Sequence, residues 1–385
     1  LHLCDRRQRQ MCIRDRKNMN NMYLKKIVTL VLTQNCNLNC SYCYEHSKTK
    51  KTMSVETAKK IIEKEINTND EYPEIIFEFF GGEPFLEFDL IKELYEYIWN
   101  PKFTKKRVCF VSTNGTLLTD KMKEWLSQRK QYIVCGLSVD GTKKMHNINR
   151  SKSFDSIDLD FFVNTWPEQS AKMTISKETI NDLAEGIIFL HNKRFLISAN
   201  LAHGVDWSEP NLSDILEEQL NKLIEFYVDN PDIQPCSMMS MPISRLASDD
   251  INKRWCGSGT HMKAYDIDGQ CYPCQMFLPI SSTESRNFES INFSDDEKFK
   301  DPFCNNCPID AICPNCYGMN YNNRGNVAIR DHNLCVLTKI IALAVSKMQY
   351  LKIQRYGIES ISKEPLEQYK VVKGIEIIQK QLSYF

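Results

Sequence analysis

The chain has neither an excess of charge of one sign nor a long apolar run. Its 49 Lys and Arg residues balance 49 Asp and Glu residues, so the charge does not indicate binding to nucleic acid or to an anionic membrane. No apolar run reaches the roughly 18 residues that a membrane-spanning helix needs. The strongest candidate, 334–345, is interrupted by Lys339 and is better explained as a buried helix. We therefore expect a cytoplasmic protein with no nucleic-acid or membrane partner.

The first sixteen residues lack the apolar core of a signal peptide. They contain five of the fifteen arginines of the chain and show no periodicity. We interpret residues 1–22 as a non-native or disordered leader, and we expect Met19 or Met22 to be the true start. Without a secretion signal, the sixteen cysteines of this long chain are not expected to form disulfides. Because they gather in two regions, they indicate metal or iron–sulfur cluster binding.

Short β-type runs alternate with amphipathic helical stretches between residues 25 and 230. This alternation predicts an α/β fold, a parallel sheet with helices outside, as an open sheet or a partial six-stranded (β/α)6 TIM-like barrel. Ligands of such sheets bind at the carboxyl ends of the strands. The expected strands are 25–33, 74–81, 106–113, 132–140, 171–176 and 195–202. The expected helices are 54–66, with Ser54 as N-cap, 87–99, 117–129, 177–192 and 212–229.

The rest of the chain differs in composition. We expect the core domain to span 23–230 and a linker without periodicity to follow at 231–255. Residues 256–345 hold many cysteines and few long apolar runs, which predicts a small domain stabilised by metal. Residues 346–385 are predicted to form a helical tail.

Three cysteines directly follow the first predicted strand, in the stretch CNLNCSYC. Cys36, Cys40 and Cys43 are one ligand short of a tetrahedral zinc site. Their spacing suits a [4Fe–4S] cluster with three irons held by the protein and one iron open to another ligand. The alternatives are three incidental thiols, or a zinc site that His46 completes.

This CxxxCxφC pattern resembles the signature of the radical S-adenosylmethionine (radical SAM) enzymes. The resemblance implies that Tyr42 lies beside the adenine of SAM and that the open iron chelates SAM. It also implies reductive cleavage of SAM to a 5′-deoxyadenosyl radical, which abstracts hydrogen from a C–H bond. The cofactors supply this chemistry and the protein positions them.

Further segments at the ends of consecutive predicted strands fit the same family. GGEP follows the second strand, STNG ends the third and SVDG ends the fourth; each alone would be an ordinary turn. The resemblance implies that these loops bind SAM. Arg150 is either a partner of the SAM carboxylate or a solvated surface arginine, and Asp140 is a weaker candidate contact. The expected SAM-binding residues are Tyr42, Gly81, Gly82, Glu83, Pro84, Asn114, Ser138 and Ser176.

The second group of cysteines resembles the SPASM domain, a twitch-type auxiliary iron–sulfur domain of peptide-modifying radical SAM enzymes. The resemblance implies two auxiliary [4Fe–4S] clusters, and zinc knuckles are the alternative. The last gap between cysteines in the SPASM pattern is three residues, but in this chain it is two. This departure concerns the assignment of Cys316 as a ligand. Cys271 is an extra thiol, Cys236 is unassigned, and Cys109 and Cys135 are expected in the core. The implied ligands are Cys256, Cys274 and Cys316 for one cluster, and Cys304, Cys307, Cys313 and Cys335 for the other.

The resemblance implies a maturase that forms a thioether or a carbon–carbon crosslink in a ribosomally made peptide. Its electron donor would be of the flavodoxin or ferredoxin type. An anaerobic sulfatase maturase, which makes formylglycine, is an alternative, but Gln275 stands where that branch has a catalytic Asp, and Gln cannot accept a proton as a carboxylate does. A non-catalytic iron–sulfur or zinc scaffold is a further alternative. No room for a leader-binding module is expected before Lys25, and the catalytic base is left unassigned.

Overall fold

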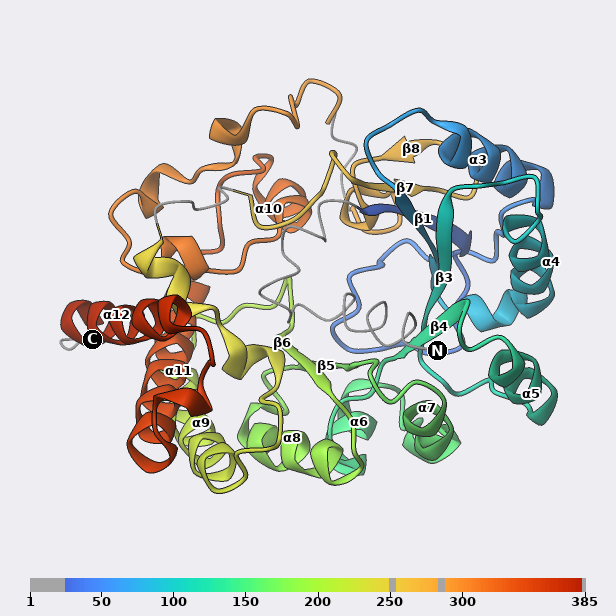
Figure 1. Cartoon of the computed structure of the whole chain (residues 1–385). Helices are drawn as coiled ribbons and strands as arrows, with labels where there is room; N and C mark the ends of the chain where they lie inside the picture. Colours follow the sequence, from blue (N-terminus) through green and yellow to red (C-terminus); the bar gives the residue numbers. More distant parts are fainter. Residues whose placement is uncertain (1–24, 249–253, 283–287, 383–385) are drawn as a thin grey trace.

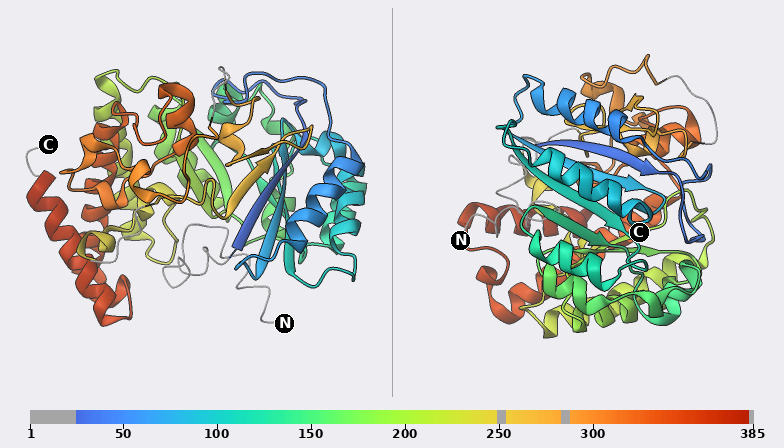
Figure 2. Two further views of the ribbon diagram at one scale, coloured as in Figure 1. Left: turned by 90° about the horizontal axis from the view of Figure 1, so that it is seen from above. Right: turned by 90° about the vertical axis from the view of Figure 1, so that its right-hand side faces the viewer.

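The computed structural model describes residues 25–248, 254–282 and 288–382. The leader predicted at 1–22 lies outside these residues. The described chain forms a curved sheet with helices on its outer side, and a cysteine-rich, mostly irregular region lies beside the sheet (Figure 1). The view from above in Figure 2 shows the last two helices, α11 and α12, at the end of the molecule remote from α3 and α4.

The predicted partial barrel is confirmed. Strands β1 to β4 are parallel neighbours in one sheet, and β5 and β6 form a second parallel pair. A single parallel bridge between Ser138 and Lys172 joins the end of β4 to β5. The bounds are β1 Lys25–Thr33, β2 Glu74–Gly81, β3 Lys106–Thr113, β4 Ile133–Leu137, β5 Ala171–Ile175 and β6 Ile197–Leu201.

The helices that cover the barrel follow the predicted order. Ser54 caps α3 as predicted, because its side chain accepts a hydrogen bond from the amide of Thr57. Two helices of seven residues each, α6 and α7, were not predicted, since two turns are too short for a clear apolar period. The bounds are α3 Val55–Asn67, α4 Phe88–Ile98, α5 Asp120–Gln128, α6 Lys143–Asn149, α7 Leu159–Thr165, α8 Leu183–Asn192 and α9 Asn211–Asp229.

Strand β2 shows how the sheet separates an apolar side from a polar side. Phe77 and Phe79 have no exposed surface, and they lie in register with Cys109 and Val111 of β3 on the same side of the sheet. Glu78 points to the opposite side, because successive side chains of a strand alternate. The apolar side is therefore the core beneath the helices, and the polar side faces the barrel lumen.

The cysteine-rich region extends the barrel sheet, which was not predicted. Strand β7 (Met262–Tyr265) pairs parallel to β1, and β8 (Cys271–Tyr272) pairs antiparallel to β7. The Tyr265 hydroxyl donates to buried Glu65 of α3, and Glu65 also lies 2.5 Å from Lys26 Nζ of β1. Strands of four and two residues give no alternating pattern in the sequence, so only the pairing itself identifies them.

The C-terminal helices α10 (Tyr317–Arg324), α11 (Leu334–Tyr356) and α12 (Pro365–Leu382) complete the fold. Helix α11 is long and apolar enough to cross a membrane by length and composition alone, but 44% of its most apolar window is buried inside the protein. It packs along α9, where Arg355 pairs with Asp229 at 2.5 Å and the Tyr356 hydroxyl donates to the Val228 carbonyl at 2.7 Å. We therefore interpret α11 as a core helix, as predicted for its first half.

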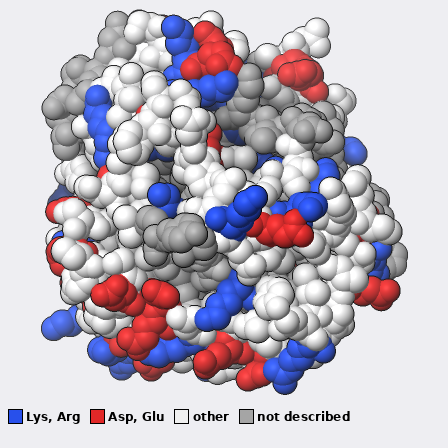
Figure 3. Space-filling model, turned by 90° about the vertical axis from the view of Figure 1, so that its left-hand side faces the viewer, with Lys and Arg blue, Asp and Glu red and all other residues white. Residues whose placement is uncertain are grey.

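The segment predicted as a linker contains two short 3-10 helices, η5 (Ser237–Ser240) and η6 (Ile243–Ala247). Met239 and Ile243 have no exposed surface. Helix α12 lies so close to η6 that a Cβ on Gly374 would be 2.3 Å from the Ile243 carbonyl oxygen. This segment is thus packed between the barrel and the tail. On the face that Figure 3 shows, Lys and Arg side chains lie among Asp and Glu side chains, as expected for a chain without net charge.

Candidate functional site

The three clustered cysteines lie in the loop between β1 and α3, directly beyond the carboxyl end of β1. Their thiols are partly buried. The Cys43 amide donates to the Cys40 carbonyl at 3.1 Å, and the Cys36 sulfur accepts from the Leu38 amide at 3.4 Å. Burial raises the pKa of Cys36 to about 11. The loop therefore brings three shielded thiols to the end of the barrel where ligands of α/β sheets bind.

Hydrogen bonds tie this loop to the end of helix α6 and to the segment that follows β3. The Ser41 amide donates to the Asn149 carbonyl at 2.9 Å. The Asn37 side chain donates to the Thr116 hydroxyl at 2.8 Å and accepts from the Asn114 amide group at 2.9 Å. The side chain of Asn114, an expected SAM-binding residue, thus also holds the cysteine loop in place.

Two glycines of the GGEP segment pack directly against the same loop. A Cβ on Gly81 would lie 2.0 Å from the Thr33 carbonyl oxygen, and one on Gly82 would lie 2.2 Å from the Asn35 oxygen and 3.0 Å from Cys36 Cβ. Gly81 also has a φ of +128°, which L side chains rarely adopt. Only glycine therefore fits between β2 and the start of the cysteine loop.

We predict that Gly81→Ala destabilises the protein more than Gly357→Ala does. Both glycines have a positive φ, but no atom lies within 4 Å of a Cβ on Gly357. Gly357→Ala should cost only backbone strain, about 1–3 kcal/mol, whereas Gly81→Ala adds a clash with Thr33. Urea denaturation of both variants measures the difference in free energy of unfolding, and equal losses would contradict the proposed close packing.

The Glu83 carboxylate is buried and joins the ends of β2 and β3. It accepts hydrogen bonds from the Thr113 hydroxyl at 2.7 Å, the Asn114 amide at 2.8 Å and the Phe85 amide at 3.0 Å. Its own amide donates to the Asn35 carbonyl at 2.9 Å. Burial, which outweighs these hydrogen bonds, raises the pKa of Glu83 to about 7. Glu83 therefore fixes the geometry of the strand ends.

The raised pKa of Glu83 predicts a pH-dependent stability. The folded protein holds this proton up to about pH 7, whereas the unfolded chain releases it near its ordinary value of about 4.3. The free energy of unfolding should therefore fall as pH rises between these values, by about 3 kcal/mol. Glu83→Gln cannot ionise, so the difference between wild type and Glu83→Gln in urea unfolding should shrink from pH 5 to pH 7. A difference that does not change with pH would contradict the shift.

Asp140 is a fully buried carboxylate that gathers four partners from three segments. Its Oδ2 accepts from the Tyr42 hydroxyl at 2.5 Å, from Arg150 Nε at 2.9 Å and from Asn149 Nδ2 at 3.2 Å. Its Oδ1 accepts from the Thr174 amide at 2.9 Å. Asp140 thus links the cysteine loop, the end of α6 and strand β5 at one point.

Arg150 is not a solvated surface residue, which corrects one alternative drawn from the sequence. It is 8% exposed, and its guanidinium lies 5.4 Å from the centre of the Tyr42 ring. Burial opposes its charge, but Asp140, Tyr42 and Cys40 together outweigh that effect and hold the pKa of Arg150 above its ordinary value. Sequence reasoning missed Asn149, which binds both Asp140 and the Ser176 hydroxyl. Asn149 lies at the end of α6, a short helix that was not predicted, so no sequence pattern marked it as a site residue.

The remaining expected SAM-binding positions lie around the same edge. Ser138 is partly exposed at the end of β4, and its amide donates to the Thr113 carbonyl at 2.9 Å. Ser176 is buried beyond β5 and donates to Asn149 at 2.8 Å. Pro84 is buried at the start of a 3-10 helix, η2 (Pro84–Glu87). Among these three, Ser138 is the one that the protein leaves accessible.

We predict that Asp140→Asn is strongly destabilising. The change leaves Arg150 as a buried cation without its counter-ion, and removing one partner of a buried ion pair costs about 3–5 kcal/mol. Asp155→Asn is the matched control, because its carboxylate pairs with Lys143 on the surface, where both side chains are exposed, and such pairs contribute about 0–1 kcal/mol. Chemical denaturation should separate the two variants, and similar losses would count against a central role for Asp140.

Three thiols of the cysteine-rich region interact as one set. Burial raises the pKa of Cys274 to about 12, with smaller contributions from the nearby thiols of Cys316 and Cys256. The pKa of Cys316 is raised to about 11, again by burial and by Cys256. The extra thiol, Cys271, lies opposite Tyr265 in the β7–β8 pair.

The other four thiols form a second set. Burial raises the pKa of Cys313 to about 11, and the neighbouring thiols of Cys335 and Cys307 add to this. Cys304, whose pKa burial raises to about 12, lies near Cys313. The two sets of thiols have the same membership as the two ligand sets that the resemblance implies.

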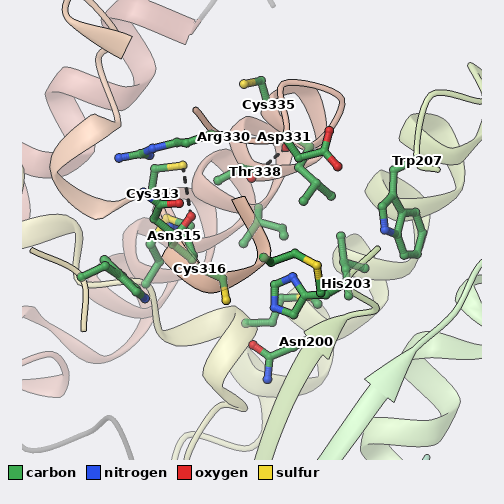
Figure 4. Close-up of a pocket in the computed structure, with 18 of the residues that line it drawn as sticks. Asn200, His203, Trp207, Cys313, Asn315, Cys316, Arg330, Asp331, Cys335 and Thr338 are labelled. Atoms are coloured by element: carbon green, nitrogen blue, oxygen red, sulfur yellow. Dashed lines mark hydrogen bonds between the residues drawn. The ribbon is translucent and has the colours of Figure 1, made fainter. Parts of the chain in front are cut away.

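A cavity of about 290 Å³ lies between the end of β6 and the cysteine-rich region. Asn200 and His203 line it from the barrel side, and Cys313, Cys316 and Cys335 lie on the other side (Figure 4). Apolar side chains, among them Trp207, Met238, Met241 and Trp255, complete the lining. All four thiols of the second set, together with Cys316, therefore face the barrel across this cavity.

The donor sets consist of thiols, the ligands that iron–sulfur clusters require. Within the described residues, no group of three His, Cys, Asp or Glu side chains converges tightly enough to hold one metal ion. A [4Fe–4S] cluster takes one thiolate on each iron, so its ligands surround a larger volume. His46, which the zinc alternative requires, is exposed. The close approach of Gly82 to Asn35 and Cys36 holds the three-cysteine loop against the end of β2.

Comparison with known proteins identifies a radical SAM domain in the first half of the chain. Residues 30–157 match the Radical SAM superfamily. The chain is 36% identical over 117 residues to the uncharacterized protein MJ0907 of Methanocaldococcus jannaschii, and 32% identical over 136 residues to a cysteine-type anaerobic sulfatase-maturating enzyme of Clostridium perfringens. These matches cover 30% and 33% of this chain, but only 39% and 35% of the relatives.

A longer match is to the radical SAM cyclopropyl synthase TigE of Paramaledivibacter caminithermalis, at 24% identity over 374 residues, or 87% of this chain and 76% of TigE. Two solved structures share the fold. One is anSMEcpe with bound AdoMet and Kp18Cys peptide, with a TM-score of 0.65, 19% identity and coverage of 86% of this chain and 99% of that one. The other is Streptococcus suis SuiB bound to precursor peptide SuiA, with a TM-score of 0.53, 16% identity and coverage of 82% and 78%.

Proposed function

We propose that this chain, an enzyme with a radical SAM domain at residues 30–157, modifies a ribosomally made peptide by forming a thioether or a carbon–carbon crosslink. The observation that carries the proposal is the placement of two groups of thiols around one end of the barrel. The similarity to TigE over most of the chain supports it, as does the shared fold with SuiB, which was solved with a precursor peptide.

A radical SAM domain implies a [4Fe–4S] cluster and SAM. Cys36, Cys40 and Cys43 would hold the cluster, and when bound the two cofactors supply a carbon radical that abstracts hydrogen from a C–H bond. Gly81 and Gly82 let the end of β2 pack directly against the cysteine loop, beside the proposed SAM site. We propose SAM contacts from both glycines and from Tyr42, Glu83, Pro84, Asn114, Ser138 and Ser176, with the bonds of Asp140 and Asn149 holding Tyr42 and Ser176 in place.

Two auxiliary [4Fe–4S] clusters are part of the proposal. Cys256, Cys274 and Cys316 would hold one, and Cys304, Cys307, Cys313 and Cys335 would hold the other. The separation of the seven thiols into these two sets supports the assignment. We further propose a flavodoxin- or ferredoxin-type electron donor and a cytoplasmic location.

Cysteine variants test this assignment. We predict that Cys36→Ala, Cys40→Ala or Cys43→Ala abolishes reductive cleavage of SAM to 5′-deoxyadenosine and lowers iron content by about one of three clusters. Cys236→Ala, which removes a fully buried thiol outside the ten proposed ligands, should keep both properties. Anaerobic reconstitution with iron and sulfide analysis and quantification of 5′-deoxyadenosine provide the measurements. A chain that binds zinc, or that keeps its clusters but never cleaves SAM, would favour a scaffold.

The peptide substrate is tested by anaerobic co-expression with small cysteine-rich peptides encoded next to the gene. Mass spectrometry should find a peptide that has lost two hydrogens, with one free thiol fewer if the product is a thioether. Unchanged masses for every neighbouring peptide would contradict the proposal. Formylglycine formation is the second candidate, favoured by the similarity to the sulfatase-maturating enzyme. Gln275 argues against it, since an amide cannot serve as the base. An aldehyde-specific probe on the peptide distinguishes the two products.

A further inference from the structure

Four polar side chains form a hydrogen-bonded row across the barrel lumen, and we name them the polar floor: Thr29, Glu78, Ser112 and Lys172. Glu78 Oε2 accepts from the Thr29 hydroxyl at 2.9 Å, and its Oε1 accepts from the Ser112 hydroxyl at 3.1 Å. Lys172 Nζ donates to Ser112 Oγ at 2.8 Å. The row links β1, β2, β3 and β5, so it joins the two sheets of the barrel inside the lumen.

The polar floor continues toward the cavity that the second set of thiols lines. Lys172 and Thr174 lie two residues apart on β5 and share one face of the strand. Thr174 is in register with Asn200 of β6, and Asn200 lines the cavity. One continuous face of the barrel thus carries the Lys172 ammonium at one end and the cavity at the other.

Tyr44 connects the first cysteine loop with the cysteine-rich region. It directly follows Cys43 in the chain, and its ring packs against the buried cluster around Phe277 in the cysteine-rich region. One residue therefore joins the loop that carries the first three thiols to the region that carries the auxiliary thiols.

The polar floor retains capacity for a ligand. A carboxylate offers about four acceptor positions, and Thr29 and Ser112 occupy one on each oxygen of Glu78. The Lys172 side chain is exposed and uses one of its three N–H groups on Ser112. Glu78 and Ser112 are partly exposed. An acceptor and a cation are thus presented together, which suits a group that gives up a proton and becomes an anion.

We propose that Glu78 is the proton acceptor for a cysteine thiol of the substrate peptide, and that the Lys172 ammonium stabilises the resulting thiolate. The inference rests on the proposed function and narrows it to thioether formation. In this step the S–H bond breaks, an O–H bond forms on Glu78 and the electron pair stays on sulfur, so no oxidant is needed. Ser112 positions both charged groups because it donates to Glu78 and accepts from Lys172.

The test compares Glu78→Gln, Glu78→Asp and Glu74→Gln in the enzyme with all clusters reconstituted, using the co-expressed peptide that wild type modifies. Glu78→Gln keeps the shape and an acceptor oxygen but cannot take a proton. We expect crosslinked peptide to form at least about 100-fold more slowly, the usual effect of a lost general base, while SAM cleavage continues. Glu78→Asp should recover part of the rate, and Glu74→Gln, on the same strand but paired with Lys25, should match wild type.

The outcomes separate the inference from the proposed function. If wild type modifies no peptide, the proposed function fails. If wild type makes the crosslink and Glu78→Gln makes it equally fast, or if Glu78→Gln and Glu78→Asp lose it equally, Glu78 is not the base. If Glu78→Gln does not fold, as judged by circular dichroism, the Lys172→Met variant tests the proposal instead, because the Lys172 side chain is exposed. It should slow crosslinking while SAM cleavage continues, and an unchanged crosslinking rate would overturn the proposal.

Discussion

The buried carboxylate of Asp140 is the interaction on which the geometry of the candidate site depends. A fully buried charge is costly unless it is paired and hydrogen-bonded, and Asp140 meets this requirement with Tyr42, Asn149, Arg150 and the Thr174 amide. These partners come from segments far apart in the chain. Satisfying one carboxylate therefore fixes the cysteine loop, the end of α6 and strand β5 relative to one another before any cofactor binds.

The same loop is held from its other side by the end of β2. Gly81 and Gly82 contact its first residues at distances that exclude a Cβ, and Glu83 joins that end to β3. The cysteine-rich region then pairs β7 with β1, the strand that leads into the loop. The strand that leads into the cysteine loop therefore also pairs with the cysteine-rich region. Tyr44, which follows Cys43 in the chain, packs against the same region.

The barrel strands and the order of the site loops were predictable, because apolar runs of five to nine residues and glycine-rich strand ends leave clear local patterns. The predicted bounds of β1, β2 and β3 match the structure. Helices α6 and α7 and strands β7 and β8 were not predicted, since each is too short to show a period. Burial of Arg150 was equally hidden, because its counter-ion lies ten residues earlier in the chain and meets it only through the fold.

The sequence by itself determined the local chemistry: which thiols are close in the chain, where strands end in glycine, and that Gln275 carries no proton-accepting carboxylate. These features follow from residue type and short-range spacing. Only the tertiary structure decided which distant groups meet. It paired Asp140 with Arg150, divided seven cysteines into two sets and aligned Glu78, Ser112 and Lys172 across the lumen. Such contacts depend on strand register and sheet closure, which set side-chain neighbours across 30 to 60 residues of sequence and leave no trace in any short segment.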